Sequence, residues 1–155
     1  MFVEKVQELF DELGSSKIMV LATSDYGNVT ARSMSIIIYK NKFYFQTDKT
    51  FIKYNQIINN PNVALCFNNI QVEGACRELG HPLVEENKFF AEKFKEHFIN
   101  SYTAYSHMEN EVLIEITPKK ITSWKYNDTP YREFLNFDTK SYYKEIYNNK
   151  KWFYK

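Results

Sequence analysis

Short strand-like runs separated by turns dominate the sequence, and they limit the folds that the chain can adopt. The run Ile18–Thr23 is apolar without polar alternation, which is typical of a strand covered on both faces. Residues 25–28, Asp-Tyr-Gly-Asn, suit a hairpin turn after it. Strands are expected at residues 18–23, 28–39, 43–47, 62–68, 70–79, 111–117 and 120–126. So many short strands with few helices favour an α+β or all-β fold with a closed sheet over a doubly wound parallel sheet.

Helical segments accompany these strands. Helices are expected at residues 2–13, 51–59 and 84–98. The first and third of them carry apolar side chains at helical spacing, with charged residues between. We expect Tyr102, Tyr105 and His107 on a linking loop. Residues 138–155 are rich in Tyr, Lys and Asn, and they form either a docked helix or a loosely held tail after a single domain at residues 1–137.

The composition bounds the class of protein. With 155 residues, 44% of them hydrophobic and 17% aromatic, the chain fits one domain and can fill a core. Its net charge of +1 is spread along the sequence, which argues against a nucleic-acid or membrane-surface binder. The first residues lack the features of a signal peptide, and no apolar stretch approaches the roughly 20 residues that span a bilayer. We therefore expect a cytoplasmic protein in which Cys66 and Cys76 are free thiols.

The sequence shows no recognisable arrangement of metal ligands or catalytic side chains. His81, His97 and His107 lack the close pairing of a helical zinc site, so we expect no metal. No serine, cysteine or carboxylate stands in a recognisable nucleophile or general-base motif. The residues by themselves therefore indicate neither metal chemistry nor a side-chain nucleophile.

The segment of residues 47–53 is the most informative candidate site, because a strand ends there and a helix begins. Thr50 is a plausible N-cap, and Lys53 would lie in the first turn, where free N–H groups and the helix dipole favour an anion. The hydroxyls of Thr47 and Thr50 with the Lys53 ammonium make a credible phosphate pocket, to which Arg32 could add a guanidinium. The alternative is a capped helix with a solvated lysine and an ion-paired arginine.

A set of short motifs, taken in order, identifies a family. Arg32-Ser33-Met34, Phe45-Gln46-Thr47, Lys53, Asn60-Pro61 and Val72-Glu73-Gly74 resemble the pyridoxamine 5′-phosphate oxidase-like FMN-binding split barrels. The resemblance covers about two-thirds of the chain. It implies an α+β fold built on an antiparallel split barrel, here of six or seven strands with flanking helices. It also implies a homodimer with the cofactor between the subunits.

The resemblance assigns contacts to the cofactor FMN. Residues that match Arg32 and Lys53 hold its phosphate in this family, with help from the hydroxyl that matches Thr47. Ser33, in the same motif as Arg32, is expected to contact the cofactor, and backbone groups at Met34 and Ser35 meet the polar edge of the ring. Further contacts are expected from Thr50 in the helix-start segment and from Asn69, which replaces a family glutamine.

A second set of contacts is implied near the end of the chain. Ser123-Trp124 and Pro130-Tyr131-Arg132 resemble a degraded form of the oxidase's tryptophan–proline–arginine segment, which comes from the second subunit. Trp124 and Arg132 would therefore lie near the ring bound by the partner. Glu133-Phe134-Leu135 stands where the fuller motif continues, so oxidation of pyridoxamine 5′-phosphate itself is not expected.

The resemblance implies an FMN-dependent oxidoreductase that transfers a hydride between flavin and an unidentified small molecule. It leaves the catalytic residues and the substrate unknown. Two alternatives stay open: a non-catalytic protein that binds flavin or partners another redox protein, and a split barrel that uses deazaflavin or haem.

Overall fold

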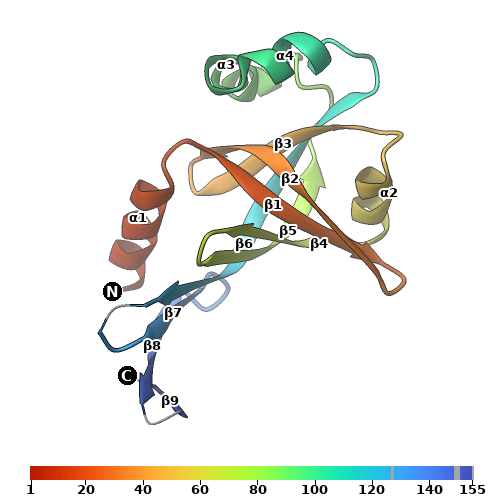
Figure 1. Ribbon diagram of the computed structural model, residues 1–155. Helices are drawn as coiled ribbons and strands as arrows, with labels where there is room; N and C mark the ends of the chain where they lie inside the picture. The colour runs from red at the N-terminus through yellow and green to blue at the C-terminus, as the bar shows by residue number, and fades with distance from the viewer. Residues whose placement is uncertain (127, 149–150, 155) are drawn as a thin grey trace.

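The computed structural model describes residues 1–126, 128–148 and 151–154 (Figure 1). The strands are β1 (Ser16–Asp25), β2 (Asn28–Tyr39), β3 (Lys42–Asp48), β4 (Asn62–Phe67), β5 (Ile70–Glu78), β6 (Glu111–Lys125), β7 (Tyr131–Asn136), β8 (Ser141–Asn148) and β9 (Lys151–Tyr154). The helices are α1 (Phe2–Leu13), α2 (Ile52–Asn59), α3 (Lys88–His97) and α4 (Ile99–Tyr105), with a 3-10 turn, η1, at Glu85–Asn87. Within these residues, no helix has both the length and the apolar composition to cross a bilayer.

The first six strands close into an antiparallel barrel. Their order in the sheet is β3-β2-β1-β4-β5-β6, and a further pairing between β3 and β6 closes the ring. Strands β7, β8 and β9 continue the sheet beyond β6 and project from the barrel (Figure 1). The α+β split barrel expected from the sequence is therefore confirmed, with six strands in the barrel itself.

Alternation along the strands separates the barrel interior from its outside. In β2, Ile36 and Ile38 point into the main core while Ile37 points out, as the period-two pattern predicts. Helix α1 covers one end of the interior, where the rings of Phe10 and Phe43 lie 5.6 Å apart between centroids. The core is therefore continuous from α1 through the barrel.

A second, smaller core lies outside the barrel. The segment between β5 and β6, residues 79–110, is here called the helical insert, and it carries η1, α3 and α4 beside β3 (Figure 1). Its apolar side chains pack on the outer face of β2, β3 and β6 in a cluster formed by Ile37, Tyr44, Phe90, Phe94 and Leu113. The linking loop expected for Tyr102 and Tyr105 is wrong, because both residues belong to α4.

Strand β6 corrects another expectation. The two strands expected on either side of Pro118 are one strand, Glu111–Lys125, with an irregularity in its pairing to β5 between Glu73 and Gly74. A proline is tolerated there because the ladder is already interrupted. Gly74 permits the close approach: an added Cβ would lie 2.7 Å from the carbonyl oxygen of Thr117.

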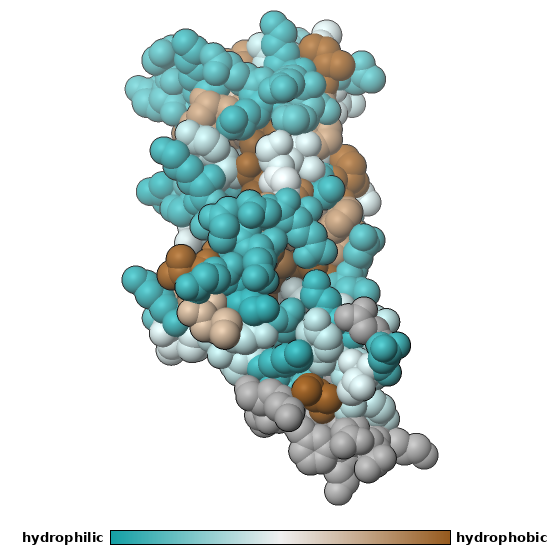
Figure 2. All heavy atoms as spheres, turned by 90° about the vertical axis from the view of Figure 1, so that its left-hand side faces the viewer, coloured by the Kyte–Doolittle hydropathy of each residue, from teal (hydrophilic) through white to brown (hydrophobic). Residues whose placement is uncertain are grey.

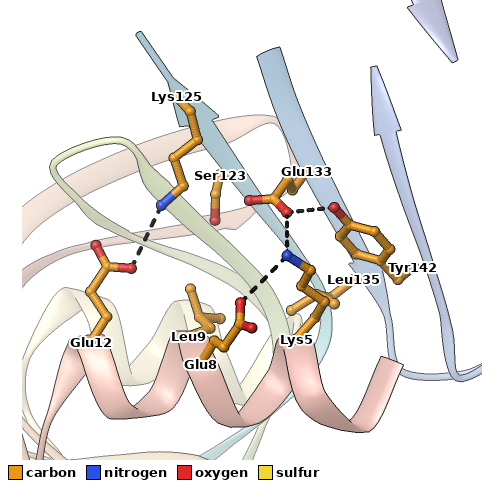
Figure 3. Close-up of a pocket in the computed structure, with 9 residues that line it drawn as sticks. All are labelled: Lys5, Glu8, Leu9, Glu12, Ser123, Lys125, Glu133, Leu135 and Tyr142. Carbon is orange, nitrogen blue, oxygen red and sulfur yellow. Dashed lines mark hydrogen bonds and ion pairs between the residues drawn. The ribbon is translucent and has the colours of Figure 1, made fainter. Parts of the chain in front are cut away.

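The C-terminal segment forms strands, so the expected helix or loose tail is wrong. Side chains of β8 alternate between two faces of the extension, as strand geometry requires. On one face the rings of Tyr143 and Phe134 stack with centroids 4.5 Å apart. On the other face Tyr142 donates a hydrogen bond of 2.5 Å to Glu133, which also pairs with Lys5 of α1 at 3.4 Å (Figure 3). The extension is thus docked on α1 through a polar cluster.

Candidate functional site

A cavity of about 510 Å³ lies where β2, β3, the start of α2 and the helical insert meet. It is lined by Ser33, Met34, Ser35, Gln46, Thr47, Asp48, Phe51, Lys53, Phe94, Ser101, Tyr105, Met108 and Glu111. A shallower hollow lies beside it and shares Phe51 and Lys53 with the cavity; its other lining residues are Arg32, Thr50 and Ile52. Seven of the residues expected to bind a cofactor therefore gather at one place.

Thr47 carries an unused polar group at this place. It follows Phe43 and Phe45 on the same side of β3, and its side chain is only 2% exposed. Its hydroxyl has no hydrogen-bond partner, and no other buried side-chain polar atom of the described residues is in that position. Because buried polar groups are almost always paired in folded proteins, an unpaired hydroxyl lining a cavity indicates a ligand.

Arg32 is held in place by hydroxyls and a carbonyl group. Its guanidinium donates hydrogen bonds to the carbonyl oxygen of Leu21 at 3.1 Å, to Thr23 Oγ1 at 2.8 Å and to Thr30. Gln56 of α2 then accepts from Thr23 and Thr30, at 2.5 and 2.7 Å. This network orients the guanidinium without neutralising it, and burial lowers the pKa of Arg32.

Lys53, the second residue of α2, is a second cation close to Arg32. Burial and the charge of Arg32 both lower the pKa of Lys53, and its ammonium lies 4.6 Å from the centroid of the Phe51 ring. Across the described residues, neither Arg32 nor Lys53 forms an ion pair with a carboxylate. Two partly buried cations with no paired counter-ion make a site for an anion. Arg32, Thr47 and Lys53 are called the anion corner below.

The helix start differs from the expected one. Thr50 is not the N-cap of α2, because the helix begins at Ile52 after Phe51 and no side chain caps it. Asp48 instead accepts hydrogen bonds from the backbone N–H and the hydroxyl of Thr50, at 2.8 and 2.6 Å. The Thr50 hydroxyl is thus used in a local hydrogen bond to the Asp48 carboxylate, two residues earlier, and does not cap the helix. The first turn of α2 thus keeps its N–H groups free of a side-chain cap, which favours an anion there.

The sequence analysis did not predict the cavity residues that come from the helical insert and from the start of β6. Phe94, Tyr105 and Met108 come from the helical insert, and Glu111 begins β6 beside Asp48. Burial, followed by the charge of Asp48, raises the pKa of Glu111. No local motif marks these residues, because only the pairing of β3 with β6 and the packing of the insert bring them to the cavity.

Three expected cofactor contacts lie elsewhere in the chain. The backbone N–H of Trp124 donates to the carbonyl oxygen of Asn69 at 2.9 Å, and Trp124 stands opposite Arg132 in the β6–β7 ladder. Arg132 Nε lies 2.9 Å from the carboxylate of Glu145. None of the three lines the cavity. They form a group of their own where the barrel meets its extension.

The fold and the anion corner define a split barrel with two cations and an unpaired buried hydroxyl near the start of α2. The family model of pyridoxamine 5′-phosphate oxidase matches residues 3–125, and the chain belongs to this family. No protein with a curated description matches the sequence.

Solved structures agree on the fold. General stress protein 26 from Bacillus anthracis str. Sterne is similar at 23% identity and a TM-score of 0.59, over 78% of this chain and 92% of that one. A pyridoxamine 5′-phosphate oxidase-related FMN binding protein from Nostoc punctiforme PCC 73102 is similar at 14% identity and 0.62, over 95% and 93%. HutZ, a haem storage protein from Vibrio cholerae, is similar at 13% identity and 0.59, over 76% and 91%. These likenesses concern the fold, and the last two names refer to different ligands, FMN and haem.

Replacing Thr47 by valine tests the unpaired hydroxyl. Valine keeps the shape of threonine and removes a buried polar group without a partner, so we expect the free energy of unfolding of the ligand-free protein to rise by about 1 kcal/mol. A phosphate-bearing ligand should at the same time bind about tenfold more weakly. Urea unfolding and ligand titration measure the two effects. A fall in stability would show that the hydroxyl has a partner in the free protein.

Proposed function

We propose that the chain binds FMN with its phosphate at the anion corner and works as an FMN-dependent oxidoreductase on a small molecule. The unpaired, buried hydroxyl of Thr47 beside two cations is the observation that carries this proposal. A phosphate dianion would accept hydrogen bonds from Thr47 and balance the charges of Arg32 and Lys53. The FMN binding protein from Nostoc punctiforme, which has the same fold, supports the choice of ligand.

Each part of the site has a physical role in this proposal. The flavin, when bound, supplies the hydride chemistry, and the protein supplies position and environment. Thr23 and Thr30 hold the Arg32 guanidinium in place before the ligand arrives, which reduces the cost of ordering on binding. Ser33, Met34 and Ser35 line the cavity next to the corner, where the resemblance places the edge of the ring.

A homodimer is part of the proposal, and the outer face of the sheet supports it. Directly paired residues give this face one continuous row across seven strands: Ser33, Val20, Cys66, Gln71, Thr122, Phe134 and Tyr143. Next to this row, Ile18 is 54% exposed, and within it Val20 is 42% exposed. The surface on the α1 side of the molecule is by contrast mostly hydrophilic (Figure 2). A strand face that exposes Ile18 and Val20 among small and polar side chains is suited to burial against a second copy.

The same face explains how Trp124 and Arg132 would reach a cofactor. Both stand on the outer face with Val20 and Ser33. Counted from β2 through β1, β4 and β5, however, Trp124 on β6 is four strands away and Arg132 on β7 is five, roughly 20 Å or more along the sheet. A two-fold axis through this face would bring them over the β2 residues of a second copy. The proposed dimer therefore reconciles the expected role of Trp124 and Arg132 with their place in one chain.

The alternatives differ in what they require of the cavity. Haem needs an axial ligand, and within the described residues no histidine lines the cavity. A deazaflavin with a phosphate-bearing tail would use the same anion corner. A non-catalytic flavin protein would bind FMN in the same way and differ only in its reactivity. The two free cysteines fit a cytoplasmic location, which stays part of this proposal.

Titration with FMN and with riboflavin tests the proposal. The purified protein should bind FMN with a changed visible spectrum, and riboflavin, which lacks the phosphate, at least about tenfold more weakly. Equal affinity for the two would contradict the assignment of the anion corner. If NAD(P)H and other reductants leave bound FMN oxidised, the non-catalytic alternative holds. Binding of haem but not of FMN would replace the proposal.

A further inference from the structure

The cavity beyond the anion corner has a distinctive chemistry. Its walls are apolar and aromatic, formed by Phe51, Phe94, Tyr105 and Met108. Two carboxylates, Asp48 and Glu111, complete the lining. Among the described residues that line it, Lys53 is the cation, and it belongs to the anion corner. The compartment is therefore apolar and acidic once the corner is occupied.

The charges that remain in this compartment after FMN has bound determine whether it favours an anionic or a cationic substrate. With an FMN phosphate bound, the charges of Arg32 and Lys53 are offset, and Asp48 and Glu111 are left without a compensating cation. A substrate with its own phosphate or carboxylate would meet repulsion there. A protonated amine would meet attraction, which is strong in a partly buried site.

Glu111 is the carboxylate best placed to meet such a ligand. It is 7% exposed, and one of its oxygens accepts a hydrogen bond of 3.1 Å from the Gln46 amide. Gln46 is itself fixed by Ser106 at the end of the insert, which donates to it at 2.8 Å. Within the described residues, no donor reaches the other oxygen of Glu111. A carboxylate oxygen that is open to a cavity and has no protein partner is a site for a hydrogen-bond donor.

We propose that this compartment binds the substrate as a small aromatic amine, whose ammonium group donates a hydrogen bond to Glu111 and whose ring packs on Tyr105 and Phe94. The proposal deepens the proposed function and rests on it. Tyr105 is an exposed residue of α4, so the ring would also shield it from water. Glu111 is a binding residue in this proposal and takes no part in the transfer of the hydride.

The titratable groups around Glu111 give the binding a pH dependence. Burial, followed by Asp48 on β3, raises the pKa of Glu111. The hydrogen bond from Gln46 lowers this pKa, as do Lys53 on α2 and His81 after β5, while Ser106 carries no charge. A bound ammonium would lower the pKa of Glu111 further. The affinity for an amine should therefore increase as the pH rises through the pKa of Glu111 and the carboxyl loses its proton.

Three ligands of one shape provide the test: benzylamine, benzyl alcohol and benzoate, titrated into FMN-loaded protein. Calorimetry and the shift of the flavin spectrum both report binding without any turnover. We expect benzylamine to bind about tenfold or more tightly than benzoate, with benzyl alcohol between them. Glu111→Gln should reduce that preference by about tenfold and remove the pH dependence. Glu109→Gln, an exposed residue two positions away, is the matched control and should keep both.

The outcomes separate this inference from the function on which it rests. Failure of the native protein to bind FMN overturns both. Native protein that binds FMN but takes benzoate as tightly as benzylamine overturns the inference alone, whether or not any variant folds. An unchanged preference in Glu111→Gln, with FMN still loaded, assigns the selectivity to another group and also overturns it.

Discussion

Replacing Arg32 and Lys53 together by alanine should weaken FMN binding by about 100- to 10,000-fold. Each residue would supply a charged hydrogen bond to the phosphate, and such bonds contribute about 1.5–3 kcal/mol each. The fold should survive, because the two cations repel each other and have no carboxylate partners among the described residues. Removing both side chains also removes the repulsion between their charges. Fluorescence titration with FMN measures the loss of affinity, and circular dichroism checks the fold.

Two controls make this result specific to the phosphate. Lys49→Ala removes an exposed lysine that lines neither the cavity nor the hollow, so FMN affinity should stay within about twofold of the native value. Riboflavin should bind the native protein and the double variant almost equally. If the double variant loses riboflavin and FMN to the same extent, the two cations act on something other than the phosphate.

Replacing Val20 by glutamate should convert the proposed dimer to a monomer. Val20 lies in the row of paired residues on the outer face, so the dimer would bury the new carboxylate without a partner, at a cost of several kcal/mol. The dissociation constant of the dimer should rise by at least about 100-fold. FMN affinity should fall with it, because Trp124 and Arg132 of a second copy would no longer cover the site. Sedimentation and FMN titration measure the two effects.

Val3→Glu is the matched control for this change. Val3 is 79% exposed on α1, outside the proposed interface, so the same substitution there should leave both the oligomeric state and FMN affinity unchanged. A native protein that sediments as a monomer would contradict the dimer. A Val20→Glu variant that becomes monomeric and keeps full FMN affinity would show that one chain completes the site.

Much of the anion corner could be predicted because it depends on neighbours in the chain. The strand that ends at Thr47 and the helix that carries Lys53 are separated by a short loop, so their spacing along the sequence already sets their spacing in the fold. Arg32 is held near them by Thr23 and Thr30, whose hydroxyls donate to Gln56 of α2. The N-cap predicted for α2 was wrong for a local reason as well: the Thr50 hydroxyl donates to Asp48, and the helix begins only at Ile52.

The rest of the site could not be predicted because it depends on contacts between distant segments. Gln46 and Glu111 are 65 residues apart, and only the closure of the barrel through β3 and β6 makes them hydrogen-bond partners. Period-two alternation was visible in β2, yet it could not show which face would be covered by the insert. The C-terminal strands escaped notice because their partners, Phe134 and Glu133, lie on another strand.

The sequence by itself determined the barrel, the positions of most strands and helices, and the residues of the anion corner. The strands and helices follow from hydrophobic periodicity and turn residues, which act over a few positions of the chain. The split-barrel type and the residues of the anion corner follow from the resemblance of the ordered motifs to a known family. The tertiary structure alone decided that β6 is one strand, that residues 141–148 extend the sheet, and that an acidic, aromatic cavity adjoins the corner. The physical reason is that strand pairing and side-chain packing join residues of any separation, and no local pattern records which partner a segment will meet.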